Sequence, residues 1–268
     1  MKTKYALIVT LFVILNSTVL ILNCFSQWET EYQLTNAPGG SYLSKPNARC
    51  LTANGDTLHT VWYDRRDGVD EVYYKRSTNK GTTWEADTRL TNNIGFSIEP
   101  SVAVSGSFVH VIWYDKSPGN FEIFYKRSTD GGTTWGADIR LTNDDSVSNH
   151  PSVAAFGSNV YVVWEDNRTI NWEIFCKLSS DNGTTWGADT RLTNKAGNSY
   201  FATVEVFGSN VHIAWYDWRD GNSEIYYKRS TNAGINWEAD VRLTNNSFSS
   251  FYPSIGISGS NVHIVWSD

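Results

Sequence analysis

Short apolar blocks recur along this chain, and each is followed by a polar stretch rich in Gly, Asn, Asp and Ser. The clearest blocks, 109–115, 160–166 and 211–217, are apolar at nearly every position. Such blocks are typical of strands that are covered on both faces, whereas regular polar alternation indicates a strand with one solvated face. The pattern therefore predicts an all-β chain of short, buried strands.

The first full round of this pattern predicts four strands in a fixed order. They are an inner strand over Ala48–Ala53, a second strand over Leu58–Tyr63, a third over Glu71–Arg76, and a fourth that ends at Asn92. Three further rounds repeat the order. Consecutive strands joined by short turns favour antiparallel pairing, so each round predicts one four-stranded antiparallel sheet.

A turn of constant composition separates the third strand from the fourth. Its clearest copy reads Ser128-Thr-Asp-Gly-Gly-Thr-Thr-Trp135, and the tryptophans of the four copies lie 51 residues apart. The Asp or Asn side chain can accept hydrogen bonds from nearby backbone N–H groups, and the Gly can adopt a positive φ. A repeat of this length built from short strands predicts a β-propeller with one blade per repeat. The turn residues are Ser77, Asn79, Gly81, Trp84, Ser128, Asp130, Gly132, Trp135, Ser179, Asp181, Gly183, Trp186, Ser230, Asn232, Gly234 and Trp237.

The two ends of the repeat array predict one partial, composite blade. Residues 28–36 match the fourth strand at 84–92, while the fifth round offers an inner strand at 253–257 and a second strand at 262–268 without a third. The N-terminal strand could complete the blade that the C-terminal strands begin. We therefore expect residues 27–268 to form four complete repeats plus a partial blade, either as a five-bladed ring with one defective blade or as an incomplete propeller.

Residues 1–26 have the pattern of a secretory signal peptide. Lys2 and Lys4 precede an apolar run from Tyr5 to Leu22, and residues 24–26 form a small-x-small cleavage site. We expect export to the cell surface or the medium, with an uncleaved membrane anchor and a lipoprotein acylated at Cys24 as alternatives. The mature chain then keeps Cys50 and Cys176, whose different strand positions argue against a disulfide.

Charge narrows the range of partners. The formal net charge is −6 at pH 7, and all 28 acidic residues lie after residue 26. This balance disfavours nucleic acid and anionic membranes as partners, so contact with a membrane is expected only through the N-terminal segment. No motif predicts a cofactor, and the acidic run from Asp64 to Glu71 lacks the ligand spacing of a calcium loop, so no metal is expected.

The turn motif Ser-x-Asp-x-Gly-x-Thr-Trp resembles the Asp-box, or bacterial neuraminidase repeat, of the sialidase superfamily. Its four copies cover nearly all of residues 27–268. The resemblance implies that the boxes are structural and lie on the propeller face away from the active site. The loops from strand two to three and from strand four to one share the opposite face, and their sequences differ from blade to blade. We expect ligand binding on this variable face.

Candidate site residues on the variable face fall into two groups. The resemblance implies an arginine cluster, a tyrosine nucleophile with a glutamate, and an aspartate acid/base, for which Arg49, Glu99 and Tyr252 are the catalytic candidates. The family's Arg-Ile-Pro motif is absent, and residues 49–51 are its nearest equivalent. The ligand-binding candidates are Arg66, His150, Arg168, Trp218 and Arg219.

Residue types that recur at the same position of successive repeats, here called a column, favour structural roles for several of these candidates. Three of the arginines follow a recurrent Asp by two positions and can instead cap surface hairpins, where an ion pair contributes about 0–1 kcal/mol. The histidine column of His59, His110, His212 and His263 is likewise expected to be structural. The sequence therefore favours a secreted propeller that binds carbohydrate or another extracellular ligand. The alternatives are a retaining exo-α-sialidase and a structural or adhesive repeat protein.

Overall fold

The computed structural model of this protein describes residues 8–15, 18–25, 31–38 and 40–268. They belong to two compact units, residues 1–36 and 37–268. In the first unit, β1 (Ile8–Leu15) pairs antiparallel with β2 (Thr18–Phe25). The described ranges contain no helix of the length and apolarity that a membrane span requires. The expected signal peptide includes this hairpin, and its removal stays a prediction.

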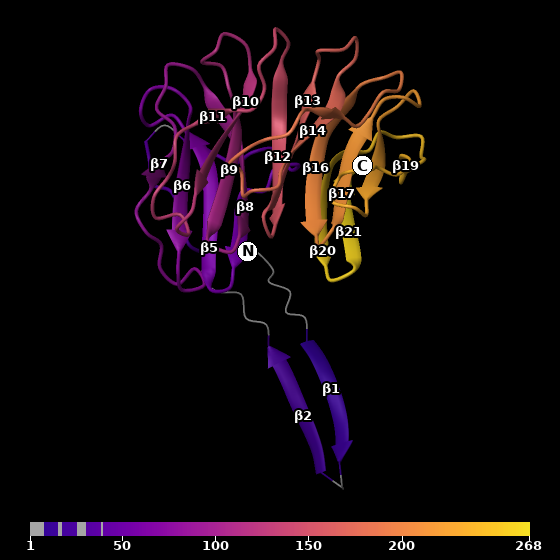
Figure 1. Ribbon diagram of the computed structural model, residues 1–268. Coiled ribbons are helices and arrows are strands. Elements are labelled where there is room, and N and C mark those ends of the chain that lie inside the picture. The colour runs from indigo at the N-terminus through magenta and orange to yellow at the C-terminus, as the bar shows by residue number, and fades with distance from the viewer. Residues whose placement is uncertain (1–7, 16–17, 26–30, 39) are drawn as a thin grey trace. The chain divides into compact units, whose positions relative to one another are not determined.

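The second unit consists of antiparallel sheets placed side by side as the blades of a propeller (Figure 1). Three of the blades contain four strands in chain order, which confirms the predicted fold class. Their strands are β8 (Ser97–Ser105), β9 (Phe108–Asp115), β10 (Glu122–Ser128) and β11 (Ile139–Arg140); β12 (Ser148–Phe156), β13 (Asn159–Asp166), β14 (Glu173–Ser179) and β15 (Thr190–Arg191); and β16 (Ser199–Phe207), β17 (Asn210–Asp217), β18 (Glu224–Ser230) and β19 (Val241–Arg242).

The first blade departs from the prediction at its inner edge. One inner strand was expected over residues 48–53, but two short strands, β3 (Ser41–Tyr42) and β4 (Leu51–Asn54), both pair with β5 (Thr57–Asp64). Residues 43–50 leave the sheet between them, so the predicted strand began too early. The blade continues through β6 (Glu71–Ser77) and β7 (Thr88–Arg89).

The last blade contains β20 (Phe251–Ser258) and β21 (Asn261–Ser267), which form a two-stranded sheet within the described residues. The strand expected over residues 28–36 begins outside the described residues, and residues 31–36 form no strand. Its proposed part in this blade therefore stays a prediction.

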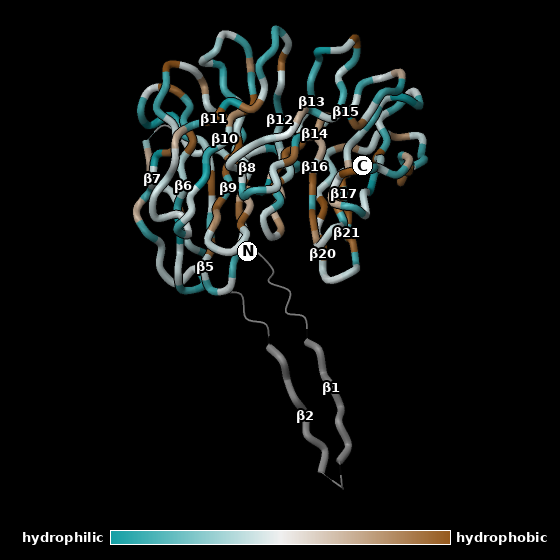
Figure 2. Tube along the Cα trace, in the orientation of Figure 1, coloured by the Kyte–Doolittle hydropathy of each residue, from teal (hydrophilic) through white to brown (hydrophobic). Residues whose placement is uncertain are grey.

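The core lies between neighbouring blades. Trp113, Trp164 and Trp215 of the second strands are fully buried. Side chains of β13 and β14, such as Val163, pack with side chains of β16 and β17, such as Ile213, in one hydrophobic cluster. Figure 2 shows hydrophobic stretches along β16 and β17 and mostly hydrophilic loops at the sheet ends. Cover from a blade on each side explains why the second strands are apolar at nearly every position.

A buried aspartate ends the second strand of the first four blades and organises the adjoining turn, whereas the equivalent Asp268 is exposed. Asp166 accepts hydrogen bonds from the backbone N–H of Arg168 (2.8 Å), from Trp164 Nε1 (3.0 Å) and from Ser148 Oγ (2.7 Å). Burial alone would raise the pKa of Asp166, but the hydrogen bonds from Arg168 and its other donors lower it overall. The expectation of a surface cap was therefore wrong about burial, because the carboxylate is fully enclosed.

The Asp-box turns form the hydrogen bonds that their composition predicts. In the second box, Asp130 Oδ1 accepts bonds from the backbone N–H of Thr133 (3.1 Å) and Thr134 (2.8 Å), and Ser128 Oγ accepts one from Gly132 N (2.8 Å). The hydroxyl of Thr134 also donates to Asp130 Oδ2 (2.6 Å), and this bond, with those from the backbone N–H groups, holds the pKa of Asp130 well below its usual range. Gly132 has φ +87°, and a Cβ there would collide with the Tyr74 hydroxyl of the preceding blade.

The second, third and fourth boxes also contact the preceding blade. Tyr74 of the first blade packs edge-on against Trp135 of the second box, with ring centroids 4.8 Å apart. Its hydroxyl lies 2.6 Å from His59 Nδ1. Burial lowers the pKa of His59 to about 4, so this imidazole is neutral at pH 7. His110 and His212 make the same contact with a tyrosine, so these three histidines are structural, while the role of the exposed His263 stays a prediction. Trp135 is only half-buried, unlike the fully buried second-strand tryptophans.

Candidate functional site

One residue near the start of each later inner strand leaves the β conformation. Glu99, His150, Phe201 and Tyr252 have φ values of 53°, 47°, 52° and 52°. At each of them the pairing register shifts by a β-bulge. A left-handed conformation costs a non-glycine residue about 1–3 kcal/mol, and bulges commonly re-aim side chains near binding sites. Glu99, His150 and Tyr252 are among the candidates that the sequence placed on the variable face.

Three of these bulge residues join an aromatic cluster. The Phe201 ring stacks on His150 at 4.2 Å between centroids and on Tyr216 at 5.6 Å, and Tyr252 meets it edge-on at 5.0 Å. Phe251 extends the cluster and lies 6.3 Å from Trp218. The structure therefore brings together three of the predicted site residues, His150, Trp218 and Tyr252.

Two members of this cluster face solvent. Trp218 is 41% exposed and Tyr252 is 38% exposed, whereas Phe201 is 9% exposed and supports them from below. Trp218 lies in the loop between β17 and β18, on the face opposite the Asp-boxes. The exposed indole and the exposed phenol both pack near Phe251 and offer two flat apolar faces with a polar edge each, which suits a ligand with both C–H and hydroxyl groups.

Two buried carboxylates lie behind the aromatic surface. Glu165 Oε1 lies 2.7 Å from His150 Nδ1, and Glu165 Oε2 accepts a hydrogen bond from Phe201 N (2.8 Å). Glu99 Oε2 accepts a bond from the backbone N–H of Lys45 (3.2 Å). Burial raises the pKa of Glu99, and the charges of His150 and Lys45 offset this only in part. Glu165 fixes the His150 ring, and Glu99 is a partly desolvated acid beside it.

Glu165 was missed by the sequence analysis, although the repeats carry a signal for it. It occupies the column that holds Tyr63, Tyr114 and Tyr216 in the other complete blades. A carboxylate in a tyrosine column is the same kind of irregularity that singled out His150. The side chains of Glu165 and His150 contact each other at the bulge. Both residues therefore depart from their repeats as a pair, of which the sequence had indicated only His150.

A loop from the first blade reaches the same inner strands. Asn47 is 2% exposed, and its Nδ2 donates to the carbonyl oxygens of His150 (3.1 Å) and Ala202 (3.3 Å) in two other blades. Arg49 forms an ion pair with Glu205 of β16, and burial raises the pKa of Glu205. Arg49 thus links the first blade to the fourth inside the propeller, in a place where it already has a carboxylate partner.

The spacing of the tryptophans in the sequence also indicates this loop. The tryptophan at position 28 precedes Trp84 by 56 residues, whereas all later intervals are 51 residues. The five additional residues fall between β3 and β4. The longer interval between the first two tryptophans therefore predicts an insertion in the first repeat.

The three predicted ligand-binding arginines occupy equivalent places in their own blades. Arg66 contacts Asp64 (2.8 Å) and Asp87 (2.7 Å), and its guanidinium lies 4.3 Å from the centre of the Tyr73 ring. Arg168 and Arg219 repeat this arrangement. Each guanidinium is held between two carboxylates and an aromatic ring of its own blade, and Arg168 also contacts Asp144 of the loop before β12 (3.0 Å). The structure does not bring the three together into one cluster, and their role in ligand binding stays a prediction.

No group of three or more His, Cys, Asp or Glu in the described part of the chain could hold a metal ion. Cys50 and Cys176 are free thiols. Cavities of about 300 Å³ and about 280 Å³ both lie on the Asp-box face, away from His150. The variable face therefore presents an exposed aromatic surface, with the His150–Glu165 pair and the buried Glu99 beneath it.

Comparison with known proteins agrees with this architecture. The family described as BNR repeat-like domain matches residues 24–264, and the chain belongs to that family. A sialidase of Clostridium perfringens is 25% identical over 245 residues, which cover 76% of this chain and 62% of the sialidase. The chain thus spans less than two thirds of that relative.

Solved structures show the same fold at low identity. The Trypanosoma rangeli sialidase in complex with sialic acid matches with a TM-score of 0.55 and 13% identity, covering 98% of this chain and 48% of that one. The α-L-arabinofuranosidase of Fusarium graminearum in complex with arabinobiose matches with a TM-score of 0.60 and 16% identity, covering 84% and 77%. The resemblance to sialidase-superfamily propellers is therefore established for the fold.

Proposed function

We propose that this chain is an exported carbohydrate-binding propeller, and that the aromatic surface of Trp218 and Tyr252 is its binding face. The proposal rests on one observation. Residues that differ between the repeats lie together at one place, although the rest of the fold is repetitive. His150, Phe201 and Tyr252 come from three blades and share a strained bulge position, and His150 and Tyr252 both contact Phe201. Sugar rings stack on such faces through their C–H groups while their hydroxyls bond to polar side chains.

The charges at this face favour a neutral sugar. Glu99 and Glu165 are both almost fully buried beneath the surface, and Glu205 lies deeper along β16. The positive partners at hand, Arg49 and His150, already contact carboxylates. The exposed Lys45, whose charge acts on Glu99, offsets only part of the repulsion that these carboxylates exert on an anionic ligand, whereas a neutral ligand is not repelled.

Retaining hydrolysis of sialosides is the second candidate, and similarity to the sialidase of Clostridium perfringens favours it. The arrangement of the arginines weighs against sialoside hydrolysis, because the three arginines belong to separate blades, where Arg66 and Arg219 are each held by two carboxylates and Arg168 by three. A sialoside carboxylate needs cations that can turn toward one site. Binding is therefore our primary proposal.

A glycan array probed with the full chain tests the proposal, together with turnover of a fluorogenic sialoside. We expect retention of neutral glycans and no turnover above a buffer blank. Trp218→Ala should weaken retention by about tenfold, since one lost stacking contact of this kind contributes on the order of 1 kcal/mol or more. Phe156→Ala is the matched control, because Phe156 is also 41% exposed but lies at the turn between β12 and β13 on the opposite face.

Three results would count against the binding proposal. Equal retention by Trp218→Ala and Phe156→Ala would place the ligand elsewhere. Turnover that Arg49→Ala or Tyr252→Phe abolishes at an unchanged melting temperature would establish the sialidase alternative. Neither retention nor turnover would favour the structural or adhesive alternative.

A further inference from the structure

A cavity of about 280 Å³ lies on the Asp-box face beside the end of β10. It is lined by Arg127 and Thr129, at the end of the third strand of the second blade, and by Thr134, Trp135 and Gly136, at the end of the second Asp-box. All of these residues belong to one complete blade in the middle of the array. The lining thus combines a guanidinium, an indole and two hydroxyl groups around one space.

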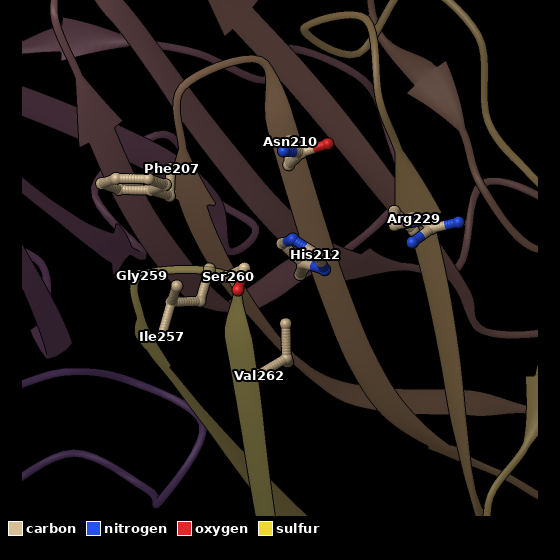
Figure 3. A pocket seen from close by; sticks show the side chains of 8 residues that line it. All are labelled: Phe207, Asn210, His212, Arg229, Ile257, Gly259, Ser260 and Val262. Carbon is tan, nitrogen blue, oxygen red and sulfur yellow. The ribbon is translucent and has the colours of Figure 1, made fainter.

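The equivalent arginines of the first and fourth blades each pair with a glutamate that directly follows the box tryptophan. Arg76 donates from Nε to Glu85 Oε1 (3.0 Å), and its Nη2 lies 2.9 Å from the same oxygen. Arg229 pairs with Glu238 in the same way, at 3.0 Å. Figure 3 shows Arg229 on β18, beside the other cavity of the Asp-box face. In both blades a carboxylate of the same sheet therefore neutralises the arginine.

Arg127 of the second blade lacks this partner. At the 51-residue period, Gly136 stands at the position of the two glutamates. Arg127 Nη1 donates to the carbonyl oxygen of Asn182 (2.6 Å) and to Thr184 Oγ1 (2.8 Å), both in the third box. Within the described residues, Arg127 Nε and Nη2 have no acceptor and Arg127 forms no ion pair. Arg127 therefore brings an unneutralised positive charge to the cavity.

The backbone does not require a glycine at position 136. Gly136 N donates to the carbonyl oxygen of Arg127 (2.9 Å), just as Glu85 N donates to that of Arg76 (2.8 Å). The φ of Gly136 lies outside the left-handed region, and a Cβ there would lie 3.5 Å from the Arg127 carbonyl oxygen, which is an ordinary van der Waals contact. The effect of the glycine is therefore to remove a carboxylate and leave its place open.

The third blade also lacks the glutamate, but it lacks the arginine as well. Leu178 and Gly187 stand at the two positions there. Among the four boxes, the second alone combines the arginine with a missing acid. An arginine without a partner, beside a cavity where its usual carboxylate is absent, is complementary to a carboxylate supplied by a ligand.

Two acidic side chains of the adjoining boxes limit this attraction. Asp130 accepts a hydrogen bond from Thr134 N (2.8 Å), and Asp181 accepts one from Thr185 N (2.8 Å). Each carboxylate is thus bound by its own turn and leaves Arg127 unpaired, but both lower the positive potential nearby. Since Arg127 is only half-buried, salt also screens its charge. The site is therefore suited to moderate affinity for an anion, with additional contacts to the rest of the ligand.

We infer that this cavity binds a hexuronic acid, that is, a six-carbon sugar ring that carries a carboxylate. The carboxylate accepts hydrogen bonds from Arg127 Nε and Nη2, as the glutamate does in the first blade. The ring packs against the indole of Trp135, and its hydroxyls bond to those of Thr129 and Thr134. Small-molecule sites in proteins begin at about 300 Å³, so this cavity suits one compact ring.

This site is separate from the neutral-sugar surface proposed for the variable face. Trp218 lies at the opposite ends of the strands, and the two sites prefer ligands of different charge. Each can therefore fail without the other. The substitution Trp218→Ala serves as the control that distinguishes them, since it should leave binding of the acid unchanged.

Titration of the full chain with D-glucuronate, followed by ligand-detected NMR, tests the inference. We expect saturable binding with a Kd on the order of 1 mM, weakened by salt, and no saturable binding of glucose at the same concentrations. Gly136→Glu should weaken binding of glucuronate more than tenfold, because the new carboxylate occupies the place of the ligand. Gly136→Ala is the matched control and should bind as the unaltered chain does.

Arg127→Leu gives an independent test, because Leu178 already occupies the equivalent position of the third blade. It should also weaken binding of glucuronate more than tenfold, with the melting temperature as the control for folding. Gly136→Glu should not lower the melting temperature, since it restores the pair that the first and fourth blades contain.

Five outcomes would overturn the inference. Equal affinity for acetate would indicate an adventitious ion only, and tighter binding of an N-acetylated, amidated glutamate would identify an acidic peptide as the occupant. Unchanged binding of glucuronate by Gly136→Glu would place the sugar elsewhere. Loss of binding in Trp218→Ala would place it on the variable face. A lack of saturable binding at about 50 mM glucuronate would rule out the site.

Discussion

Three tryptophans in different environments should differ in their effect on stability when each is replaced by alanine. Trp164 is fully buried and donates from Nε1 to Asp166 (3.0 Å). Trp135 is half-buried against Tyr74, and Trp218 is 41% exposed. Full truncation of a buried Trp costs about 3–5 kcal/mol. We expect that loss for Trp164→Ala, about half of it for Trp135→Ala, and about 0.5 kcal/mol or less for Trp218→Ala.

Thermal unfolding of the full chain measures this order. For a domain of this size, 1 kcal/mol shifts the melting temperature by about 2–4 °C, so Trp164→Ala should lower it by about 10 °C or more. Trp164→Phe is the control that keeps most of the ring but removes the donor to Asp166, and it should lose about 1–2 kcal/mol. Equal destabilisation by Trp218→Ala and Trp164→Ala would refute the burial on which the reasoning depends.

Two further predictions concern polar groups that hold the blades. Because the pKa of Asp166 is lowered on folding, its contribution to stability is complete at neutral pH and is lost as the pH falls below about 4; Asp166→Asn should flatten this part of a stability profile measured by urea unfolding between pH 2 and 6. Asn47→Ala leaves the carbonyl oxygens of His150 and Ala202 without their donor, so a loss of about 1–3 kcal/mol in chemical denaturation is expected, and no measurable loss would show that water replaces the amide.

Repetition explains why the fold could be predicted from the sequence. A residue type that returns every 51 residues, such as Trp113, Trp164 and Trp215, has the same neighbours in each blade, so the period reveals a shared environment before any coordinates exist. Burial within that environment was harder to predict. Asp166 was expected at a surface turn, yet the neighbouring strands enclose it completely.

The candidate site could be predicted only in part, because it depends on contacts between residues that do not repeat. The bulge column of Glu99, His150, Phe201 and Tyr252 was visible as an irregularity in the repeats. The pairing of His150 with Glu165 was not, since it joins two irregular columns through a geometry that the bulge creates. The loop carrying Asn47 was not predicted for a related reason. Its insertion shifts the first repeat out of alignment with the others, so its residues have no equivalents to compare.

The two faces of the propeller place different constraints on their residues. On the Asp-box face, each turn must satisfy its own backbone and also contact the preceding blade, so substitution at Gly132 or Trp135 disturbs two sheets at once. On the variable face, the bulge lifts one residue of each of the four later blades out of the strand pairing, where a new side chain need only fit its neighbours. Glu99, His150 and Phe201 accordingly differ in charge and shape while sharing one backbone conformation. A binding surface can thus be altered residue by residue at this bulge without changing the blade that supports it, which is the physical reason to seek the ligand there.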